Sequence, residues 1–318
     1  MKQHLSTAAP IRVRNWAVGL RLCASVVIAV SAISCVSHAE DTPKKQLDVF
    51  IVAGQSNSVG FDANPAELTP DEQDSKTLFW FRCGDPPPDE YDVRSNGWTH
   101  LRTQPRGNPD TRGVQQRQYG NFHFPEGGFG PEFGFIRTLR KSTPDANLAV
   151  IKSSFSGTSL IDDWDPTSQD EHGACYRALI EEVSTAVEQA EKQGYSCHIR
   201  AMIWVQGESD AKADITEKYQ AAILEMLASM RKELNAPELV ALLGVNTRFL
   251  AVDGITPGMQ AVIAAQEGAA EQSEHCVYVD LDGASLANKV HFDAAGTLEI
   301  GRRYAVAWQE WLKQTQPK

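Results

Sequence analysis

The sequence predicts an α/β protein with a single three-layer α/β/α domain and a mainly parallel sheet. Short apolar runs of strand type alternate along the chain with amphipathic stretches of helical length. The strand-type runs are apolar at successive positions, as expected where helices cover both faces of a parallel sheet. No internal repeat or second apolar core interrupts this pattern. We therefore predict one domain, over residues 47–313.

The expected elements alternate in chain order. Strands are predicted where apolar and β-branched residues cluster, at 49–53, 77–81, 148–151, 199–205, 239–245 and 276–280. Helices are predicted at 131–141, 174–193, 214–234, 259–271 and 294–314, with Gly194 ending the second and Pro237 following the third.

The segment 83–130 differs from the rest of the chain. It has clusters of proline and glycine and little apolar periodicity, and it is long for a connection inside a compact domain. We interpret it as an elaborated loop beside the functional site. It would offer a substrate the side chains of Trp98, His100, Arg106, Tyr119, Phe122 and His123.

The first 39 residues have the composition of a signal peptide. They include four basic residues and no acidic one, then a mostly apolar stretch at 22–33 and a small-x-small motif that ends at Ala39. The apolar stretch is too short for a membrane span. We therefore predict export, to the periplasm or the outside of the cell. Lipid anchoring at Cys35 is the alternative, although Ala32 fits poorly at the first position of a lipoprotein cleavage box.

Charge and motif content argue against several classes of partner. Removal of the signal peptide leaves 26 Lys and Arg against 41 Asp and Glu, a net charge of −15. Nucleic acids and anionic membranes are polyanions, so we predict neither as a partner, apart from the possible lipid anchor. The chain has no zinc-binding Cys/His spacing, no calcium loop and no phosphate-binding glycine motif, so we predict no metal and no cofactor.

The exported chain would keep four cysteines, Cys83, Cys175, Cys197 and Cys276. An even number in an exported protein permits disulfides, with three possible connectivities. Buried free thiols are the alternative, above all for Cys197 and Cys276, which adjoin strand-like runs. The sequence does not choose a pairing.

A serine follows the first predicted strand. The apolar run ends at Gly54 and Ser56 comes two residues later, which places a hydroxyl at the carboxyl end of a buried strand. Three further polar segments, 153–164, 203–210 and 288–296, are expected at the same edge of the sheet. Together the four segments supply a nucleophile, a histidine and polar groups that can hold an oxyanion. This combination predicts acyl-transfer chemistry.

The same segments resemble the ordered blocks of the SGNH hydrolases, and more narrowly those of the sialate O-acetylesterase and acetylxylan esterase group. The resemblance is carried by Gly54-Gln55-Ser56-Asn57, by Gly157-Thr158 with Trp164 behind it, by Gln206-Gly207-Glu208-Ser209-Asp210 and by His291. It runs from about Leu47 to about Leu312. It implies a flavodoxin-like SGNH hydrolase fold and an esterase that removes O-acetyl groups from an acetylated carbohydrate through an acyl-Ser56 intermediate.

The resemblance also implies a role for each residue. Ser56 would be the nucleophile and His291 the base that takes its proton. The oxyanion would be held by the backbone N–H groups of Ser56 and Gly157 and by the side-chain amide of Gln206. Supporting or substrate-contacting roles fall to Gln55, Asn57, Glu208 and Asp210.

One position departs from the family pattern. The family usually has an aspartate three residues before the histidine, where this chain has Asn288. An asparagine oxygen can accept the imidazole N–H but carries no charge. Three accounts remain open: Asn288 alone supports His291, an acid from Asp280, Asp282 or Asp293 replaces it, or a Ser-His dyad works without an acid. The departure also motivates an alternative function, a catalytically impaired carbohydrate-binding protein on the same scaffold.

Overall fold

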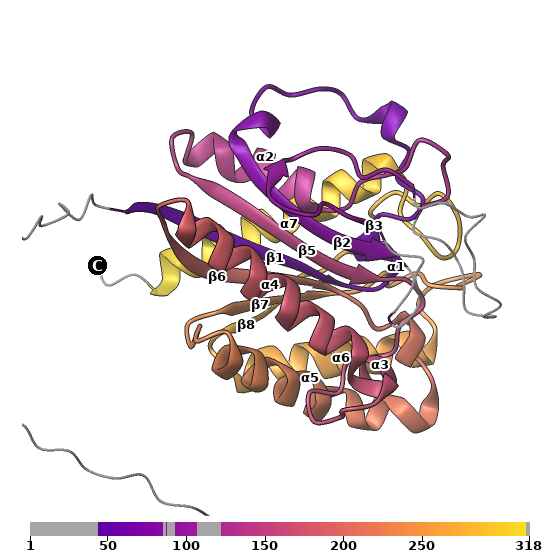
Figure 1. The fold of residues 1–318 in the computed structure, drawn as a ribbon. Coiled ribbons are helices and arrows are strands. Elements are labelled where there is room, and N and C mark those ends of the chain that lie inside the picture. The colour runs from indigo at the N-terminus through magenta and orange to yellow at the C-terminus, as the bar shows by residue number, and fades with distance from the viewer. Residues whose placement is uncertain (1–43, 85–86, 88–92, 107–121, 316–318) are drawn as a thin grey trace, which may run out of the picture. The chain divides into compact units, whose positions relative to one another are not determined.

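The computed structural model describes residues 44–84, 87, 93–106 and 122–315. Among these residues, eight strands form one sheet (Figure 1). Residues from Pro43 onwards group into one compact unit. The predicted signal peptide at 1–39, with Cys35, lies outside the described residues, as does Tyr119.

The sheet is mostly parallel and runs in the order β3-β2-β5-β1-β6-β7-β8, with β4 also paired to β2. Only the two short strands β3 and β4 run antiparallel to their neighbour β2, within the part of the chain described. The strands are β1 Lys45–Gly54, β2 Thr77–Gly84, β3 Val93–Arg94, β4 Thr99–His100, β5 Leu148–Phe155, β6 Tyr195–Val205, β7 Val240–Gly244 and β8 Cys276–Tyr278.

The order of the strands reverses at β1. From β1 the chain passes to β2 and β5 on one side, then crosses to β6, β7 and β8 on the other. The carboxyl end of β1 therefore lies where the direction of the connections changes, the usual place of ligand sites in open α/β sheets.

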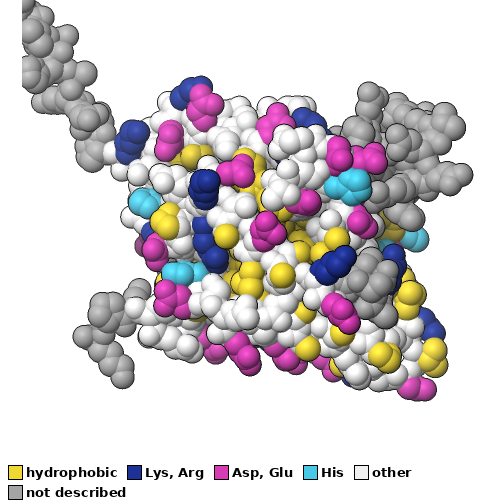
Figure 2. Space-filling model, turned by 90° about the horizontal axis from the view of Figure 1, so that it is seen from below, with side chains coloured by type: hydrophobic (Ala, Val, Ile, Leu, Met, Phe, Trp, Pro, Cys, Tyr) yellow, Lys and Arg dark blue, Asp and Glu magenta, His cyan; other side chains and the backbone are white. Residues whose placement is uncertain are grey.

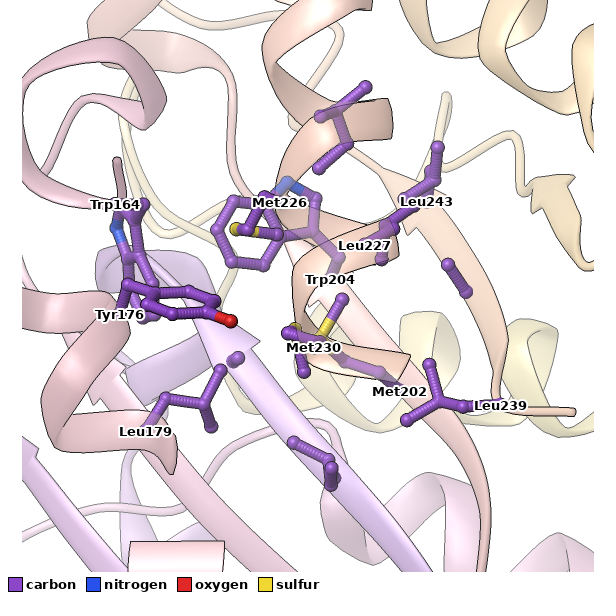
Figure 3. Packing of buried hydrophobic residues seen from close by; sticks show 14 of the residues in the cluster. Trp164, Tyr176, Leu179, Met202, Trp204, Met226, Leu227, Met230, Leu239 and Leu243 are labelled. Atoms are coloured by element: carbon purple, nitrogen blue, oxygen red, sulfur yellow. The ribbon is translucent and has the colours of Figure 1, made fainter. Parts of the chain in front are cut away.

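Helices cover both faces of the sheet (Figure 1). Helices α2 and α7 bury Phe133, Ile136 and Trp308 against one face, and α4, α5 and α6 cover the other (Figure 3). The predicted three-layer α/β fold is confirmed. The helices are α1 Ser56–Val59, α2 Glu132–Ser142, α3 Leu160–Asp163, α4 Ala174–Lys192, α5 Ala213–Glu233, α6 Pro257–Gln272 and α7 Ala294–Thr315, with short 3₁₀ helices at Pro65–Glu67, Asp74–Lys76, Glu171–Gly173 and Glu208–Asp210.

Strand β1 shows why its apolar run is continuous. Val49, Ile51 and Ala53 belong to the apolar cluster on one face of the sheet, and Phe50 and Val52 to the cluster on the other. Both sets are buried because both faces are covered by helices.

The described part of the segment 83–130 packs more tightly than expected for a substrate-binding loop. Trp98 donates from Nε1 to the carbonyl oxygen of Ala186 at 2.9 Å, so its ring lies on α4. Phe122 is fully buried. His100 lies on the exposed edge strand β4. Trp98 and Phe122 therefore serve the core, in contrast to the predicted substrate contacts.

Cys83, Cys175 and Cys276 are buried, and Cys197 is partly buried. Burial raises the pKa of the partly buried Cys197 thiol to about 11. The face of the molecule in Figure 2 carries acidic side chains spread among fewer basic ones, in line with the acidic composition. No helix within the described ranges is long and apolar enough to cross a membrane.

Candidate active site

The turn after β1 depends on Gly54. Its φ is +125°, and a Cβ at this position would lie 2.3 Å from the carbonyl oxygen of Val205. Only glycine fits there, and the chain turns at once into α1, whose first residue is Ser56. Ser58 closes the turn by donating from Oγ to the carbonyl oxygen of Gln55 at 2.6 Å.

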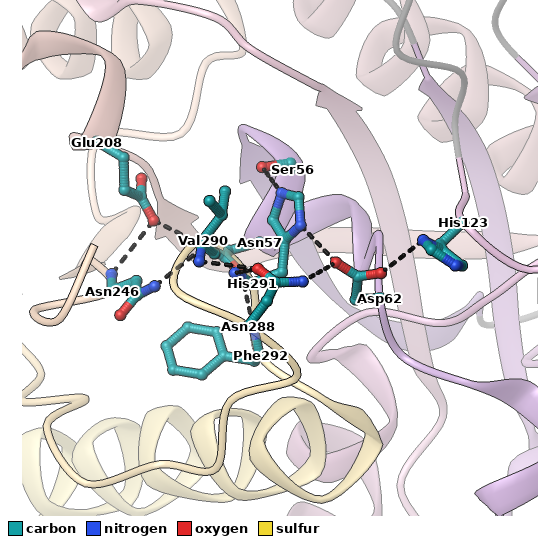
Figure 4. A network of polar contacts seen from close by, with 10 residues as sticks. All are labelled: Ser56, Asn57, Asp62, His123, Glu208, Asn246, Asn288, Val290, His291 and Phe292. Atoms are coloured by element: carbon teal, nitrogen blue, oxygen red, sulfur yellow. Dashed lines mark hydrogen bonds and ion pairs between the residues drawn. The ribbon is translucent and has the colours of Figure 1, made fainter. Parts of the chain in front are cut away.

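Three side chains form a continuous hydrogen-bonded chain at this edge (Figure 4). His291 Nδ1 lies 2.6 Å from Asp62 Oδ2, and His291 Nε2 lies 2.9 Å from Ser56 Oγ. A carboxylate only accepts, so Nδ1 carries the proton and the lone pair of Nε2 faces the hydroxyl. The ring of Phe61 packs on the imidazole at 4.8 Å between centroids. This is the arrangement of a nucleophile, a base and an acid that orients the base.

The acid is Asp62, which the sequence analysis did not consider. None of the three accounts left open by the sequence (Asn288, an acid from Asp280, Asp282 or Asp293, or a dyad without an acid) placed Asp62 against the imidazole. Asp282 pairs with Arg248 at 2.6 Å, and Asp293 accepts the backbone N–H of Gly296 at the start of α7. Asp280 accepts the backbone N–H of Asp282.

Asn288 supports the acid instead of the base. Its Nδ2 donates to Asp62 Oδ2 at 2.8 Å, and its Oδ1 accepts the backbone N–H groups of Val290 and His291. An aspartate at this position would place a second carboxylate against Asp62. An asparagine at position 288 is therefore compatible with an acid at Asp62, whereas an aspartate there would repel it.

Asp62 is held in its charged form. Burial disfavours the charge, but hydrogen bonds from His291 and Asn288 and the neighbouring histidine charges outweigh it, so the pKa of Asp62 lies below its ordinary value. Asp62 therefore remains ionised near neutral pH, where it can stabilise an imidazolium at His291.

Asn57 fastens the histidine loop to the serine helix. Its Oδ1 accepts the backbone N–H of Phe292 at 3.1 Å, while its Nδ2 donates to Val290 O and to Glu208 Oε1. Asn246 Nδ2 donates to the same Val290 carbonyl. Glu208 is buried, which raises its pKa, and it anchors Asn57 without contacting Ser56 or His291 through any recorded hydrogen bond.

A cavity of about 290 Å³ opens over Ser56. Among the described residues, the backbone N–H groups of Ser56 and Gly157 have no acceptor. Both residues line the cavity, so these two groups are available to an oxyanion. The residues that line the cavity are Gln55, Ser56, Phe61, Ser156, Gly157, Ser209, Phe249, Val290 and His291.

Gln206 does not present its amide to this cavity. Its Nε2 donates to the carbonyl oxygen of Thr158 at 3.1 Å and to Asp210 Oδ2, and its Oε1 accepts the Tyr219 hydroxyl at 2.9 Å. The side chain is fully buried. Both amide hydrogens that the sequence analysis assigned to the oxyanion are thus used inside the protein.

Gln55 and Asp210 form hydrogen bonds that hold the segments around the cavity together. Gln55 lines the cavity, and its Oε1 accepts the backbone N–H of Ser209 at 3.3 Å. Asp210 accepts the Ser159 hydroxyl at 2.6 Å and the backbone N–H of Leu160 at 2.9 Å. Burial raises the pKa of Asp210, against the effect of these hydrogen bonds. Asp210, in the polar segment 203–210, is therefore hydrogen-bonded to the polar segment 153–164.

We expect Gln206→Ala to act on stability. The substitution removes one hydrogen bond to Asp210 and another to the Thr158 carbonyl in the interior, so the free energy of unfolding should fall by about 3 kcal/mol. Denaturant unfolding measures this loss, and the exposed Gln260→Ala is the control, with a change within about 0.5 kcal/mol. A fall in kcat of about 10²-fold at unchanged stability would instead return Gln206 to the oxyanion hole.

The described part of the chain holds no cluster of three or more histidine, cysteine, aspartate or glutamate side chains suited to a metal ion.

Comparison with protein families finds one family whose sequence model matches this chain. A sequence model described as "Carbohydrate esterase, sialic acid-specific acetylesterase" matches residues 46–310, most of the chain. A search among curated proteins finds no significant match.

Solved structures share the fold at low sequence identity. A protein from Arabidopsis thaliana is 19% identical, with a TM-score of 0.59 over 84% of this chain and 99% of its own. The protein NanS is 16% identical, with a TM-score of 0.58 over 86% and 99%. A carbohydrate acetylesterase from Xanthomonas citri is 15% identical, with a TM-score of 0.57 over 85% of this chain and 57% of its own.

Proposed function

The chain belongs to the carbohydrate esterase family of the sialic acid-specific acetylesterases, a family of carboxylic ester hydrolases, and we propose that it removes O-acetyl groups from carbohydrate through an acyl-Ser56 intermediate. The observation that carries the mechanism is the chain of two short hydrogen bonds from Ser56 through His291 to Asp62. Ser56, at one end of this chain, lines the cavity. Among the described residues, the backbone N–H groups of Ser56 and Gly157 at the cavity wall have no acceptor.

The first half of the reaction forms the acyl-enzyme. Ser56 Oγ attacks the acetyl carbonyl carbon while His291 Nε2 takes its proton, and Asp62 stabilises the imidazolium that results. The carbonyl oxygen becomes an oxyanion within reach of the N–H groups of Ser56 and Gly157. The intermediate collapses when His291 returns the proton to the sugar oxygen, which leaves as a hydroxyl.

The second half releases acetate. A water molecule takes the place of the sugar, gives its proton to His291 and attacks the acetyl carbon of the Ser56 ester. Collapse of the second tetrahedral intermediate breaks the bond to Ser56 Oγ, which recovers its proton from His291. No cofactor enters either half.

The proposed substrate is an acetylated carbohydrate. The family description supports this class, as does the similar fold of a protein described as a carbohydrate acetylesterase. The cavity has the size for an acetyl group with part of a sugar ring, and Phe61 and Phe249 supply apolar walls against which the C–H face of a sugar can pack. The alternative function, a catalytically impaired carbohydrate-binding protein, was suggested by the lack of a carboxylate at Asn288. Asp62 supplies that carboxylate, so this reason no longer applies.

Under this proposal the esterase acts after export, in the periplasm or outside the cell. The composition of residues 1–39 supports export. The acidic surface of the remaining chain disfavours polyanionic partners and is compatible with a neutral glycan.

A serine-directed phosphonate tests the mechanism directly. We expect one equivalent to add to the protein, to map to the peptide that contains Ser56, and to abolish acetate release from acetylated xylan, pectin or sialic acid. Intact and peptide mass spectrometry measure the modification. A protein that releases no acetate from this panel and takes up no phosphonate would contradict the proposed function.

A further inference from the structure

We propose that His123 is a positioning residue that holds Asp62 and Phe61 against the catalytic histidine, an inference that rests on the proposed esterase function. His123 contacts this dipeptide at two places, through its ring and through its backbone. Its Nδ1 lies 3.1 Å from Asp62 Oδ1, and its backbone N–H donates to the carbonyl oxygen of Phe61 at 2.9 Å. Figure 4 shows His123 on the far side of Asp62 from His291.

The two oxygens of Asp62 have separate partners. Oδ2 accepts from His291 Nδ1 and Asn288 Nδ2, and Oδ1 faces His123. A carboxylate bonded through one oxygen alone can turn about its Cβ–Cγ bond. With His123 Nδ1 beside the second oxygen the turning of the carboxylate is restrained, and the imidazole that it orients is restrained with it.

Phe61 gives His123 a second route to the catalytic ring. The Phe61 ring packs on His291 at 34° and 4.8 Å and also lines the cavity. Because His123 holds the Phe61 carbonyl, it restrains the backbone that carries both the aromatic contact and the acid. The two contacts of the His291 ring other than Ser56, with Asp62 and with Phe61, thus come from the residue pair that His123 contacts.

The segment that carries His123 is itself anchored. The preceding Phe122 is fully buried in the apolar cluster under α2 and α7, and Lys152 Nζ lies 6.0 Å from the centre of its ring. Lys152 donates to the carbonyl oxygen of Val59 at 2.8 Å, which ties the same region to α1. His123 therefore contacts Asp62 from a segment that is anchored in the apolar cluster.

Exposure limits how strong this restraint can be. The His123 side chain is 61% exposed, against 7% for Asp62. An exposed donor competes with water and its bond is worth less than a buried one. We therefore expect an effect on orientation that is clear in the kinetics but far smaller than the loss of a catalytic group.

Three variants separate positioning from general structure. His123→Phe keeps the backbone bond and an aromatic ring but removes the donor. His123→Asn keeps a neutral N–H donor near the position of Nδ1. His172→Phe is the matched control, because His172 also pairs with an aspartate, Asp170 at 2.9 Å, with a 53% exposed side chain, and plays no part in the site.

We expect His123→Phe to lower kcat by about tenfold with KM and melting temperature nearly unchanged, since a misoriented base acts mainly in the transition state. His123→Asn should recover most of this loss. The His172→Phe control should match the wild type throughout.

Proton NMR gives a readout that needs no turnover. The downfield resonance of the His291 Nδ1 proton reports its bond to Asp62, and we expect it to shift or broaden in His123→Phe and to return in His123→Asn. Unchanged kinetics and an unchanged resonance in His123→Phe would overturn the inference, as would an equal effect in His172→Phe or no recovery in His123→Asn. A wild-type protein without esterase activity would count against the proposed function alone, because the resonance still tests the restraint.

Discussion

Replacement of Ser56 by alanine is expected to lower kcat for acetate release by about 10⁴- to 10⁶-fold. The substitution removes the only atom that forms the acyl bond, and water then has to attack without a covalent intermediate. The fold should persist because Ser56 Oγ has one recorded partner, His291 Nε2, and no part in the turn itself, which Gly54 and Ser58 make. Steady-state kinetics with an activated acetate ester and a thermal melt measure the two effects.

Ser153→Ala is the matched control for this variant. Ser153 is buried on β5 beside Ala53, and its hydroxyl has no hydrogen-bond partner among the described residues. Removal of that hydroxyl should leave kcat unchanged. Turnover by Ser56→Ala above about one-hundredth of the wild-type rate would place the nucleophile elsewhere.

Asp62→Asn is expected to have the second largest effect, a loss in kcat of about 10⁴-fold. Nitrogen atoms of three side chains face the two oxygens of Asp62: His291 and Asn288 donate to Oδ2, and His123 lies beside Oδ1. An asparagine has one acceptor oxygen and must turn its NH₂ group towards one of these nitrogen atoms. It also removes the charge that stabilises the imidazolium. Steady-state kinetics measure the loss, and circular dichroism checks the fold.

Asp282→Asn is the control for Asp62. Asp282 lies in the segment where the family pattern led us to seek the acid, but its carboxylate pairs with Arg248 and accepts from Thr247. We expect its kcat to stay within a factor of two of the wild type. If Asp62→Asn kept more than a tenth of the wild-type kcat, the acid would be dispensable and a Ser-His dyad would be the better account.

The fold could be predicted because it depends on features that are local in sequence. The apolar run before Gly54 predicts a buried strand, and Gly194 indicates the end of α4 within a residue or two. The β6 strand begins earlier than predicted, at Tyr195, because its first residues lie at the sheet margin and are only partly buried. Short edge strands such as β3 and β4, each of two residues, have no periodicity to detect.

The acid could not be predicted from the pattern because the contact joins residues 229 positions apart. The family pattern directs attention to the position three before the histidine, and Asn288 stands there. A signal was present, since Asp62 is the first acidic residue after Ser56. Its distance to the imidazole, however, depends on the turn at Gly60, where φ is +83°. The Gln206 assignment was wrong for a similar reason, because its acceptors come from other segments, at Thr158 and Asp210.

The nucleophile and the acid lie on one short stretch, residues 56–62, while the base comes from the far end of the chain. The loop that carries His291 is closed by a single bridge between Leu286 and Phe292 and is fastened to α1 by Asn57. Opening of this loop would separate the base from both of its partners in one movement, without disturbing their spacing or the sheet beneath. Under the proposed mechanism, activity is thereby linked to the local stability of one loop as well as to the stability of the whole domain.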